Sequence, residues 1–177
     1  WPPGGHFYGL VDNTLCPANE KVYETLDKIF GEIAQLFPYA YIHMGGDETY
    51  KGFWEKSDAV KALMQKEKLK NMDEVQSYFV KRVSKIIASK GKKMIGWDEI
   101  LEGGIAPDAV VMSWRGEKGG IEAAKLKHPV IMSPSTFTYV DLYQGDPLAE
   151  PPSYGNVRLK KSYDFNPVPA GVDSTYV

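Results

Sequence analysis

The sequence predicts an α/β fold in which parallel strands alternate with helices. Four short apolar runs have lengths typical of buried strands, and segments with helical periodicity precede or separate them. The four runs are residues 39–44, 93–97, 109–114 and 129–133. Each run ends in a cluster of polar or aromatic side chains. Strands that alternate with helices in this way form parallel β/α units, and 177 residues are enough to bury a sizeable core.

The N-terminal part of the chain predicts a loop, a helix and a strand in that order. Residues 1–18 are rich in Gly and Pro and predict an irregular lead-in. The helix begins at Asn19 and ends before Pro38. Its apolar face consists of Val22, Leu26, Ile29, Phe30, Ile33 and Phe37. The run at 39–44 follows as a strand and breaks into Gly45-Gly46-Asp47-Glu48, which predicts a tight turn that carries two acids.

The rest of the chain predicts further helices between the remaining strands. One helix is expected at about residues 57–66, and a stronger one begins at Asp73 and ends at Gly91. A short helical piece at residues 120–127 separates the last two strands. Residues 144–169 are rich in Pro and Gly, which favours a long irregular connection.

Composition excludes several classes of protein. Hydrophobic residues make up 43% and charged residues 25%, as in ordinary globular proteins. The net charge of −2 gives no basic excess for nucleic acid or an anionic membrane, and no apolar run is long enough to cross a bilayer. The single cysteine, Cys16, excludes an internal disulfide framework. The chain opens on Trp1-Pro2-Pro3-Gly4-Gly5 without an initiator Met, and we interpret it as a segment of a longer protein.

The C-terminal ends of the predicted strands carry the side chains with chemical functions. These groups are residues 43–48, residues 97–99, residues 113–115, and Tyr139 with Asp141. In a β/α barrel the active site is built at this end of the strands, from the loops that follow them. We therefore predict a site that these four groups form together.

Asp47 and Glu48 are the strongest candidates for catalysis. Adjacent residues that leave a strand point in different directions, so the two carboxylates can address different atoms of a ligand, one as an acid and one as an orienting anion. Gly45 and Gly46 allow a sharp turn and a close approach of the backbone to a ligand. An isolated Asp-Glu pair would ordinarily be a solvated loop, but the preceding apolar strand and double glycine favour a functional site.

Aromatic side chains at the other strand ends predict the walls of a pocket. Trp97 and Trp114 can enclose a sugar ring and exclude water, although core packing is the ordinary role of a strand-end tryptophan. Tyr139 is either packed at its strand end or hydrogen-bonded to a substrate. His43 is expected to be half-buried and to brace the acidic loop by a hydrogen bond. The remaining charged residues are expected to be structural partners of the loops: Asp98, Glu99 and Arg115.

At these positions the sequence resembles the family 20 glycoside hydrolases, the β-N-acetylhexosaminidases. His43-Met44-Gly45-Gly46-Asp47-Glu48 is similar to the H-x-G-G-D-E signature of that family. Gly96-Trp97-Asp98-Glu99-Ile100-Leu101 and Val111-Met112-Ser113-Trp114-Arg115-Gly116 resemble the ends of its next two strands. Tyr139-Val140-Asp141 is similar to its Y-x-D element, which usually has Leu in the middle. The similarity extends over essentially the full length of the chain.

The resemblance implies a (β/α)8 TIM barrel, of which this chain would form a partial barrel with about strands four to seven. Residues 1–177 would then be a single, incomplete segment of the catalytic barrel. An arginine that grips sugar hydroxyls and a third pocket tryptophan would belong to the other strands. Enzymes of this kind usually work in the periplasm, outside the cell or in lysosomes, which is the expectation for the whole protein.

The resemblance also implies an activity: a retaining β-N-acetylhexosaminidase that removes terminal β-linked GlcNAc or GalNAc. The mechanism would be substrate-assisted and pass through an oxazolinium intermediate. The implied catalytic residues are Asp47, Glu48 and Tyr139. Glu48 would act as general acid and base, Asp47 would orient the 2-acetamido group, and Tyr139 would donate a hydrogen bond to its oxygen. The implied substrate-binding residues are His43, Trp97, Trp114 and Asp141.

The same resemblance implies no metal or organic cofactor. The partners would be glycans that contain N-acetylhexosamine, without nucleic acid or insertion into a membrane. The unpaired strand edges of a partial barrel would favour self-association or association with the missing barrel segments.

Three alternatives stay open at this point. His43, Asp47 and Glu48 could be ligands of a hydrolytic metal, although one histidine and two adjacent acids make a poor set. The chain could be a catalytically inert barrel fragment with a glycan-binding or structural role. A barrel hydrolase with a protein nucleophile would need a second carboxylate about 5–5.5 Å from Glu48. The strand ends offer only three candidates for it: Asp98, Glu99 and Asp141.

Overall fold

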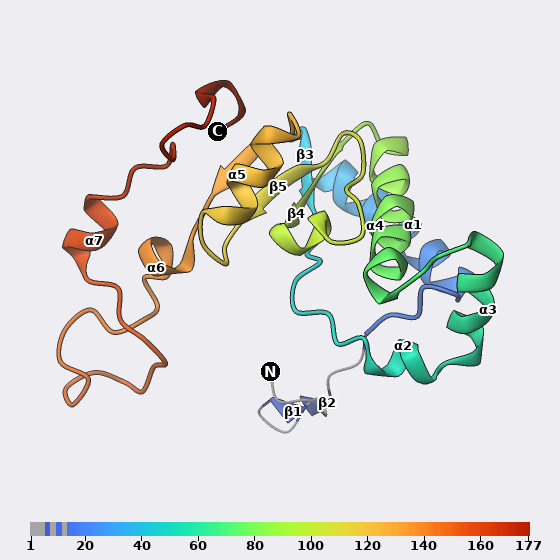
Figure 1. The fold of residues 1–177 in the computed structure, drawn as a ribbon, viewed down its shortest axis with the longest axis horizontal. Coiled ribbons are helices and arrows are strands. Elements are labelled where there is room, and N and C mark those ends of the chain that lie inside the picture. The colour runs from blue at the N-terminus through green and yellow to red at the C-terminus, as the bar shows by residue number, and fades with distance from the viewer. Residues whose placement is uncertain (1–5, 8–9, 12–13) are drawn as a thin grey trace. The chain divides into compact units, whose positions relative to one another are not determined.

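The computed structural model describes residues 6–7, 10–11 and 14–177 (Figure 1). The opening Trp1-Pro2-Pro3-Gly4-Gly5 lies outside the described residues. The chain divides into two compact units, Trp1–Ala109 and Val110–Val177, which we call the first and the second unit. Each unit contains one pair of parallel strands, so the predicted parallel β/α arrangement is confirmed within each.

The first unit contains two long helices that lie side by side, α1 (Glu20–Leu36) and α4 (Met72–Ser89) (Figure 1). Both begin at an asparagine whose side chain accepts a backbone N–H of the first turn, Asn19 from Lys21 and Asn71 from Glu74. Each asparagine in this way satisfies one of the otherwise unpaired N–H groups at the start of its helix. The helices predicted from Asn19 and near Asp73 are therefore confirmed to within one residue at their starts.

Arg82 of α4 joins the two helices. Its guanidinium donates to both carboxylate oxygens of Glu20, at 2.6 and 2.7 Å, and its Cζ lies 3.6 Å from the centroid of the Tyr23 ring. The hydrogen bond to Glu20 raises the pKa of Arg82, and the same bond lowers the pKa of Glu20. Burial raises the pKa of Tyr23, whose hydroxyl donates to the carbonyl of Pro17 at 2.7 Å.

The strands of the first unit are β3 (Tyr41–His43) and β4 (Lys93–Trp97). They pair in parallel, with Ile42 opposite Met94 in the register, and both of these side chains are buried. Helix α4 packs against β4 and contributes Val80, Val83 and Ile87 to the core. The predicted strands at 39–44 and 93–97 are confirmed.

Shorter elements complete the first unit. α3 (Asp58–Glu67) matches the helix predicted at about 57–66. α2 (Gly52–Lys56) and the 3-10 helix η1 (Asp98–Leu101) were not predicted, because elements of one turn are too short to show a period. The lead-in expected at 1–18 also contains two strands, β1 (His6–Phe7) and β2 (Leu10–Val11), which pair antiparallel.

The second unit contains β5 (Val110–Ser113), α5 (Lys118–Lys125) and β6 (Val130–Met132). β5 and β6 pair in parallel, with Val111 opposite Val130, and α5 packs on both strands. The predicted strands at 109–114 and 129–133 are confirmed, and the predicted helical piece at 120–127 begins two residues earlier.

The C-terminal part of the second unit departs from the prediction of an irregular connection at 144–169. It contains the short helix α7 (Leu159–Tyr163), and α6 (Ser135–Thr138) and the 3-10 helix η2 (Ser174–Tyr176) flank the predicted segment. The ring of Phe165, just after α7, stacks on Phe137 of α6 at 4.9 Å. This contact between distant residues stabilises a helix of five residues that no local pattern indicates.

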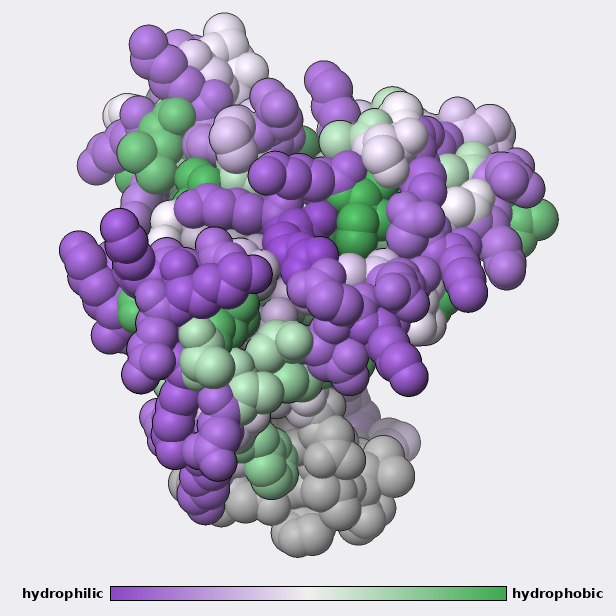
Figure 2. Space-filling view, turned by 90° about the vertical axis from the view of Figure 1, so that its right-hand side faces the viewer, coloured by the Kyte–Doolittle hydropathy of each residue, from purple (hydrophilic) through white to green (hydrophobic). Residues whose placement is uncertain are grey.

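The outer surface shown in Figure 2 is mostly hydrophilic, with apolar residues in small groups. No helix in the described part of the chain is both long and apolar enough to span a bilayer.

Candidate functional site

A tight loop follows β3 and carries the two acids of the predicted site. Gly45 and Gly46 have φ of 83° and 98°, and Glu48 has φ of 44°. Glycine adopts such angles freely, but a residue with a Cβ does so at a cost. A Cβ added at Gly46 would lie 2.9 Å from Cγ2 of Ile100, which is buried beneath the loop. The backbone angles therefore favour glycine at both positions, and close packing against Ile100 also requires it at Gly46.

His43, at the end of β3, supports the start of the loop. Its Nδ1 accepts the backbone N–H of Gly45 at 3.1 Å, so the predicted bracing hydrogen bond is present. The centroid of the His43 ring lies 4.7 Å from that of the Trp97 ring. The backbone N–H of Trp97 donates to the carbonyl of Gly45 at 3.0 Å. The residue as a whole is exposed at the end of β3, whereas its ring is partly shielded from water, so the expected half-burial holds for the ring but not for the whole residue.

Removal of water from the His43 ring lowers its pKa, and the carboxylate of Asp47 acts in the opposite direction. The neutral form is also the one whose Nδ1 can accept the Gly45 N–H. The structure therefore favours a neutral imidazole at this position.

Two buried side chains from other elements bind the backbone on either side of Asp47. Nε2 of Gln76, in α4, donates to the carbonyl of Gly46 at 2.9 Å. Oε1 of Glu99, in η1, accepts the backbone N–H of Glu48 at 3.4 Å. Gln76 is 3% exposed and Glu99 is 6% exposed. The role predicted for Glu99, a structural partner of the loops, is confirmed by this bond.

The distal end of the loop is also held. Lys51 forms ion pairs with Asp73 of α4 and with Glu102, the latter at 3.3 Å. Oγ1 of Thr14 donates to the carbonyl of Tyr50 at 3.1 Å. The loop from Gly45 to Lys51 is thus held at several points, by α4, by η1 with the adjoining Glu102, and by Thr14 in the segment before α1.

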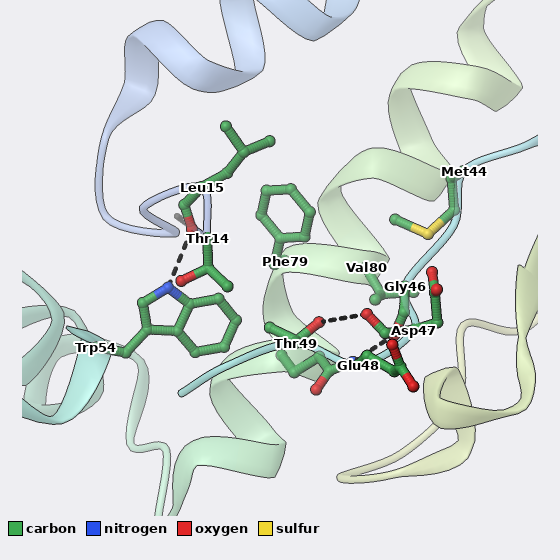
Figure 3. A pocket seen from close by; sticks show the side chains of 11 residues that line it. Thr14, Leu15, Met44, Gly46, Asp47, Glu48, Thr49, Trp54, Phe79 and Val80 are labelled. Atoms are coloured by element: carbon green, nitrogen blue, oxygen red, sulfur yellow. Dashed lines mark hydrogen bonds between the residues drawn. The ribbon is translucent and has the colours of Figure 1, made fainter. Parts of the chain in front are cut away.

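A pocket of about 280 Å³ lies beside this loop, within the first unit (Figure 3). Asp47 and Glu48 line it with exposed side chains, and their carboxyl groups point in different directions (Figure 3). Phe79 and Val80 of α4 and Trp54 supply apolar walls. Nε1 of Trp54 is oriented by a 3.0 Å hydrogen bond to the carbonyl of Leu15. The pocket therefore combines two acids with apolar and aromatic surface, which suits a ligand with both polar and apolar faces.

The second unit brings another two predicted residues together. The rings of Trp114 and Tyr139 are stacked, with centroids 6.2 Å apart and planes inclined by 8°. The backbone N–H of Ser135 donates to the carbonyl of Trp114 at 2.8 Å, which ties the end of β5 to α6. Asp141 follows Tyr139 and is exposed.

The turn after β5 is organised by Ser113, which is fully buried. Its Oγ donates to the carbonyl of Gly116 at 2.7 Å and accepts the N–H of Gly120 at 2.9 Å. This serine holds the segment that carries Trp114 and Arg115, and it explains why a polar residue closes an apolar strand.

Several residues that shape the site were missed in the sequence. Gln76 lies on the buried stripe of α4 with Val80, Val83 and Ile87, and a polar residue on such a stripe is the signal that could have found it. Ile100 and Lys51 carry no comparable signal. Among the residues that the structure describes, no group of three or more His, Cys, Asp or Glu side chains is placed to hold a metal ion.

A sequence model of glycosyl hydrolase family 20, catalytic domain, matches residues 6–175. The chain belongs to this family. A β-hexosaminidase of Porphyromonas gingivalis is 45% identical over 164 residues, which cover 92% of this chain and 21% of that protein. A β-hexosaminidase of Vibrio furnissii is 35% identical over 89% of this chain and 26% of that protein.

Solved structures of the same family have a similar fold. An inactive mutant of the GH20 exo-β-N-acetylglucosaminidase of Vibrio harveyi superposes with a TM-score of 0.82 at 33% identity, over 94% of this chain and 27% of that one. The β-N-acetylhexosaminidase of Bacteroides fragilis gives a TM-score of 0.76 at 28% identity, over 94% of this chain and 35% of that one. These likenesses place the chain in an α/β fold of TIM-barrel type. The chain spans about a quarter of the length of the two β-hexosaminidases.

Proposed function

We propose that the chain supplies the central part of the catalytic site of a retaining β-N-acetylhexosaminidase, which removes terminal β-linked GlcNAc or GalNAc. The observation that carries this proposal is the Asp47-Glu48 pair, presented in diverging directions on a turn with left-handed residues at the C-terminal end of β3. Membership of glycosyl hydrolase family 20 supports the same activity. In this proposal the single segment 1–177 forms about strands four to seven of a (β/α)8 barrel.

Glu48 would protonate the glycosidic oxygen as its bond to the anomeric carbon breaks. The 2-acetamido oxygen of the same sugar forms the new bond to that carbon, which gives the oxazolinium ion. Because this nucleophile is already attached to the substrate, its effective molarity can reach roughly 10⁵–10⁸ M when it is well aligned. Glu48 would then take a proton from the water that opens the ring, and two inversions give net retention.

Asp47 would accept the N–H of the acetamido group, fix its orientation and stabilise its developing positive charge. His43 would act through the loop, since its Nδ1 binds the N–H of Gly45, and Trp97 would form an apolar wall of the acetamido pocket. In the second unit, Tyr139 would donate its hydroxyl to the acetamido oxygen. Its stacking on Trp114 would keep both rings on one wall of the sugar site.

Asp141 would bind a hydroxyl on the far edge of the sugar, which is consistent with its exposed position. The substrates would be glycans that end in N-acetylhexosamine. Self-association of the chain stays a prediction, and sedimentation of the purified chain as a folded monomer would contradict it.

The test is the release of a chromogenic aglycone from an aryl β-N-acetylglucosaminide. We would assay the chain itself and a chimera in which it replaces the aligned segment of the Porphyromonas gingivalis relative. We expect the chimera to cleave the substrate and its Glu48→Gln variant to lose about 10²–10⁴-fold in kcat, because the step in which water opens the oxazolinium ring loses its general base. A chimera that folds and shows no loss in the variant would contradict the role of Glu48.

The same assay separates the alternatives. If the chimera is active and the chain by itself is inert, the incomplete-barrel alternative is supported for residues 1–177 alone. An aryl glycoside without the 2-acetamido group tests for a protein nucleophile, and its unimpaired cleavage would rule out the substrate-assisted route. Burial of Asp98 and Glu99, at 2% and 6% exposed, argues against either as that nucleophile.

A further inference from the structure

We infer that Gln76 and Glu99 are positioning residues that hold Glu48 in place for proton transfer to the leaving group. The inference rests on the function proposed above, because it concerns how the acid of that site is oriented. Both residues bind the backbone of the acidic loop, Gln76 at the Gly46 carbonyl and Glu99 at the Glu48 N–H.

These two hydrogen bonds control the peptide planes on both sides of Asp47. The Gly46 carbonyl belongs to the peptide unit before Asp47, and the Glu48 N–H belongs to the unit after it. When both planes are held, the direction in which the Asp47 side chain leaves the backbone is set, and so is the N–Cα bond of Glu48 from which its side chain is placed. A donor is needed on one side and an acceptor on the other, which amide and carboxylate side chains provide.

The loop needs such external support because of its conformation. Gly46 and Glu48 both lie at positive φ, a region that is unfavourable for a residue other than Gly. The side chains of Asp47 and Glu48 are exposed, so the core does not hold them directly. The hydrogen bonds from Gln76 of α4 and Glu99 of η1 therefore hold the turn.

The surroundings of the two residues favour this role over simple packing. Gln76 lies one turn before Val80, which is 1% exposed, and Glu99 precedes Ile100, which is also 1% exposed. Burial of an amide or a carboxyl group among apolar side chains is unfavourable unless each finds a partner. Apolar residues would fill these positions at lower cost, so the polar identity is explained by the polar groups that these side chains bind, among them the backbone of the acidic loop.

The chemistry predicts a specific defect when the support is lost. A general acid contributes most when the leaving group is a poor one, because an activated aryl group departs with little protonation. A displaced Glu48 should therefore impair the cleavage of a sugar–sugar bond more than that of an activated aryl glycoside. A loss of folded protein or of sugar binding would lower both rates by the same factor.

The experiment uses the chimera described above, with a disaccharide of two β-1,4-linked GlcNAc units and an activated aryl β-N-acetylglucosaminide as substrates. The variants are Gln76→Leu and Glu99→Leu, each of which removes the side chain's hydrogen bond to the acidic loop. Glu99→Gln keeps an acceptor oxygen and is the conservative rescue. Ser77→Ala is the matched control, because Ser77 adjoins Gln76, is 2% exposed and donates to the carbonyl of Gly104 in a different loop.

For both leucine variants we expect kcat/KM on the disaccharide to fall about 10- to 100-fold, with a loss of only about threefold or less on the aryl substrate. Glu99→Gln should recover most of the disaccharide activity, and Ser77→Ala should leave the ratio of the two kcat/KM values unchanged. That ratio is independent of the folded fraction, since both substrates are measured on the same preparation.

Equal losses on the two substrates, or no loss on either, would overturn the inference while leaving the proposed function intact. Failure of the unaltered chimera to cleave either substrate, or unchanged cleavage by Glu48→Gln, would instead contradict the proposed function and remove the inference with it.

Discussion

Glu48 combines an exposed carboxyl group with a backbone conformation that residues other than Gly rarely adopt. Gly45 and Gly46 share the positive φ, so the loop just after β3 depends on backbone angles that glycine adopts most easily. Backbone strain of this kind persists only where the surroundings over-determine it, and it gathers at functional sites. Here the surroundings are His43, Gln76 and Glu99, each of which binds a backbone atom of the loop.

The neutral state of His43 leads to a prediction on pH. Because its pKa is lowered in the folded protein, the folded state binds fewer protons than the unfolded state once the pH falls below the ordinary value near 6.5. This contribution to stability is present above that pH and is lost as the pH falls toward the folded pKa. Titration of the His43 ring by NMR should give a midpoint below 6.5.

Asp47→Asn is the matched variant for this titration. The Asp47 carboxylate favours the protonated ring, so its removal should lower the midpoint of His43 further. A midpoint that rises in Asp47→Asn would contradict the arrangement of the two side chains.

At the scale of elements, α4 serves both the core and the site. Its buried stripe contains Gln76, Val80, Val83 and Ile87. The last three pack in the core on which β4 lies, while Gln76 reaches the loop after β3. The position of the acids therefore depends on how this helix packs.

The packing of α4 in the hydrophobic core can be tested by Ile87→Ala. Ile87 is fully buried, and truncation removes apolar contacts and leaves a cavity, which costs about 2–5 kcal/mol of unfolding free energy. Urea unfolding followed by circular dichroism measures this change. Lys85→Ala, on the exposed side of the same helix, should change stability by no more than about 0.5 kcal/mol. Equal effects of the two substitutions would show that α4 does not pack as described.

At the scale of the whole molecule, the residues proposed for catalysis and binding are divided between the two compact units. Asp47 and Glu48 belong to the first unit, and Trp114, Tyr139 and Asp141 belong to the second.

This proposal predicts that a change in the second unit impairs the chemistry assigned to the first. In the chimera, Tyr139→Phe should lower kcat/KM on the aryl β-N-acetylglucosaminide by about 10²-fold, because one donor to the charged acetamido oxygen is lost. Tyr154→Phe is the control, since Tyr154 lies in the same unit and is 78% exposed. Unaltered activity of Tyr139→Phe would remove the second unit from the proposed catalytic machinery.

The sequence alone determined the four strands, the longer helices and the acidic turn with its family signature. Each of these depends on residues close together in the chain, so periodicity, caps and strand-end chemistry are enough to identify them. Single-turn elements such as α2, α6 and α7 were not predicted, because four or five residues show no period. They gain their stability from contacts with distant residues.

Only the tertiary structure decided what holds the turn. Gln76 lies 30 positions from Gly46, and Glu99 lies 51 positions from Glu48. No local pattern pairs such residues, because the packing of α4 and η1 beneath the loop is what brings their polar atoms to its backbone. The tertiary structure likewise decided the exposure of His43 and the stacking of Tyr139 on Trp114. The identity of the reactive side chains is thus a local property of the sequence, whereas their orientation is a property of the packed fold.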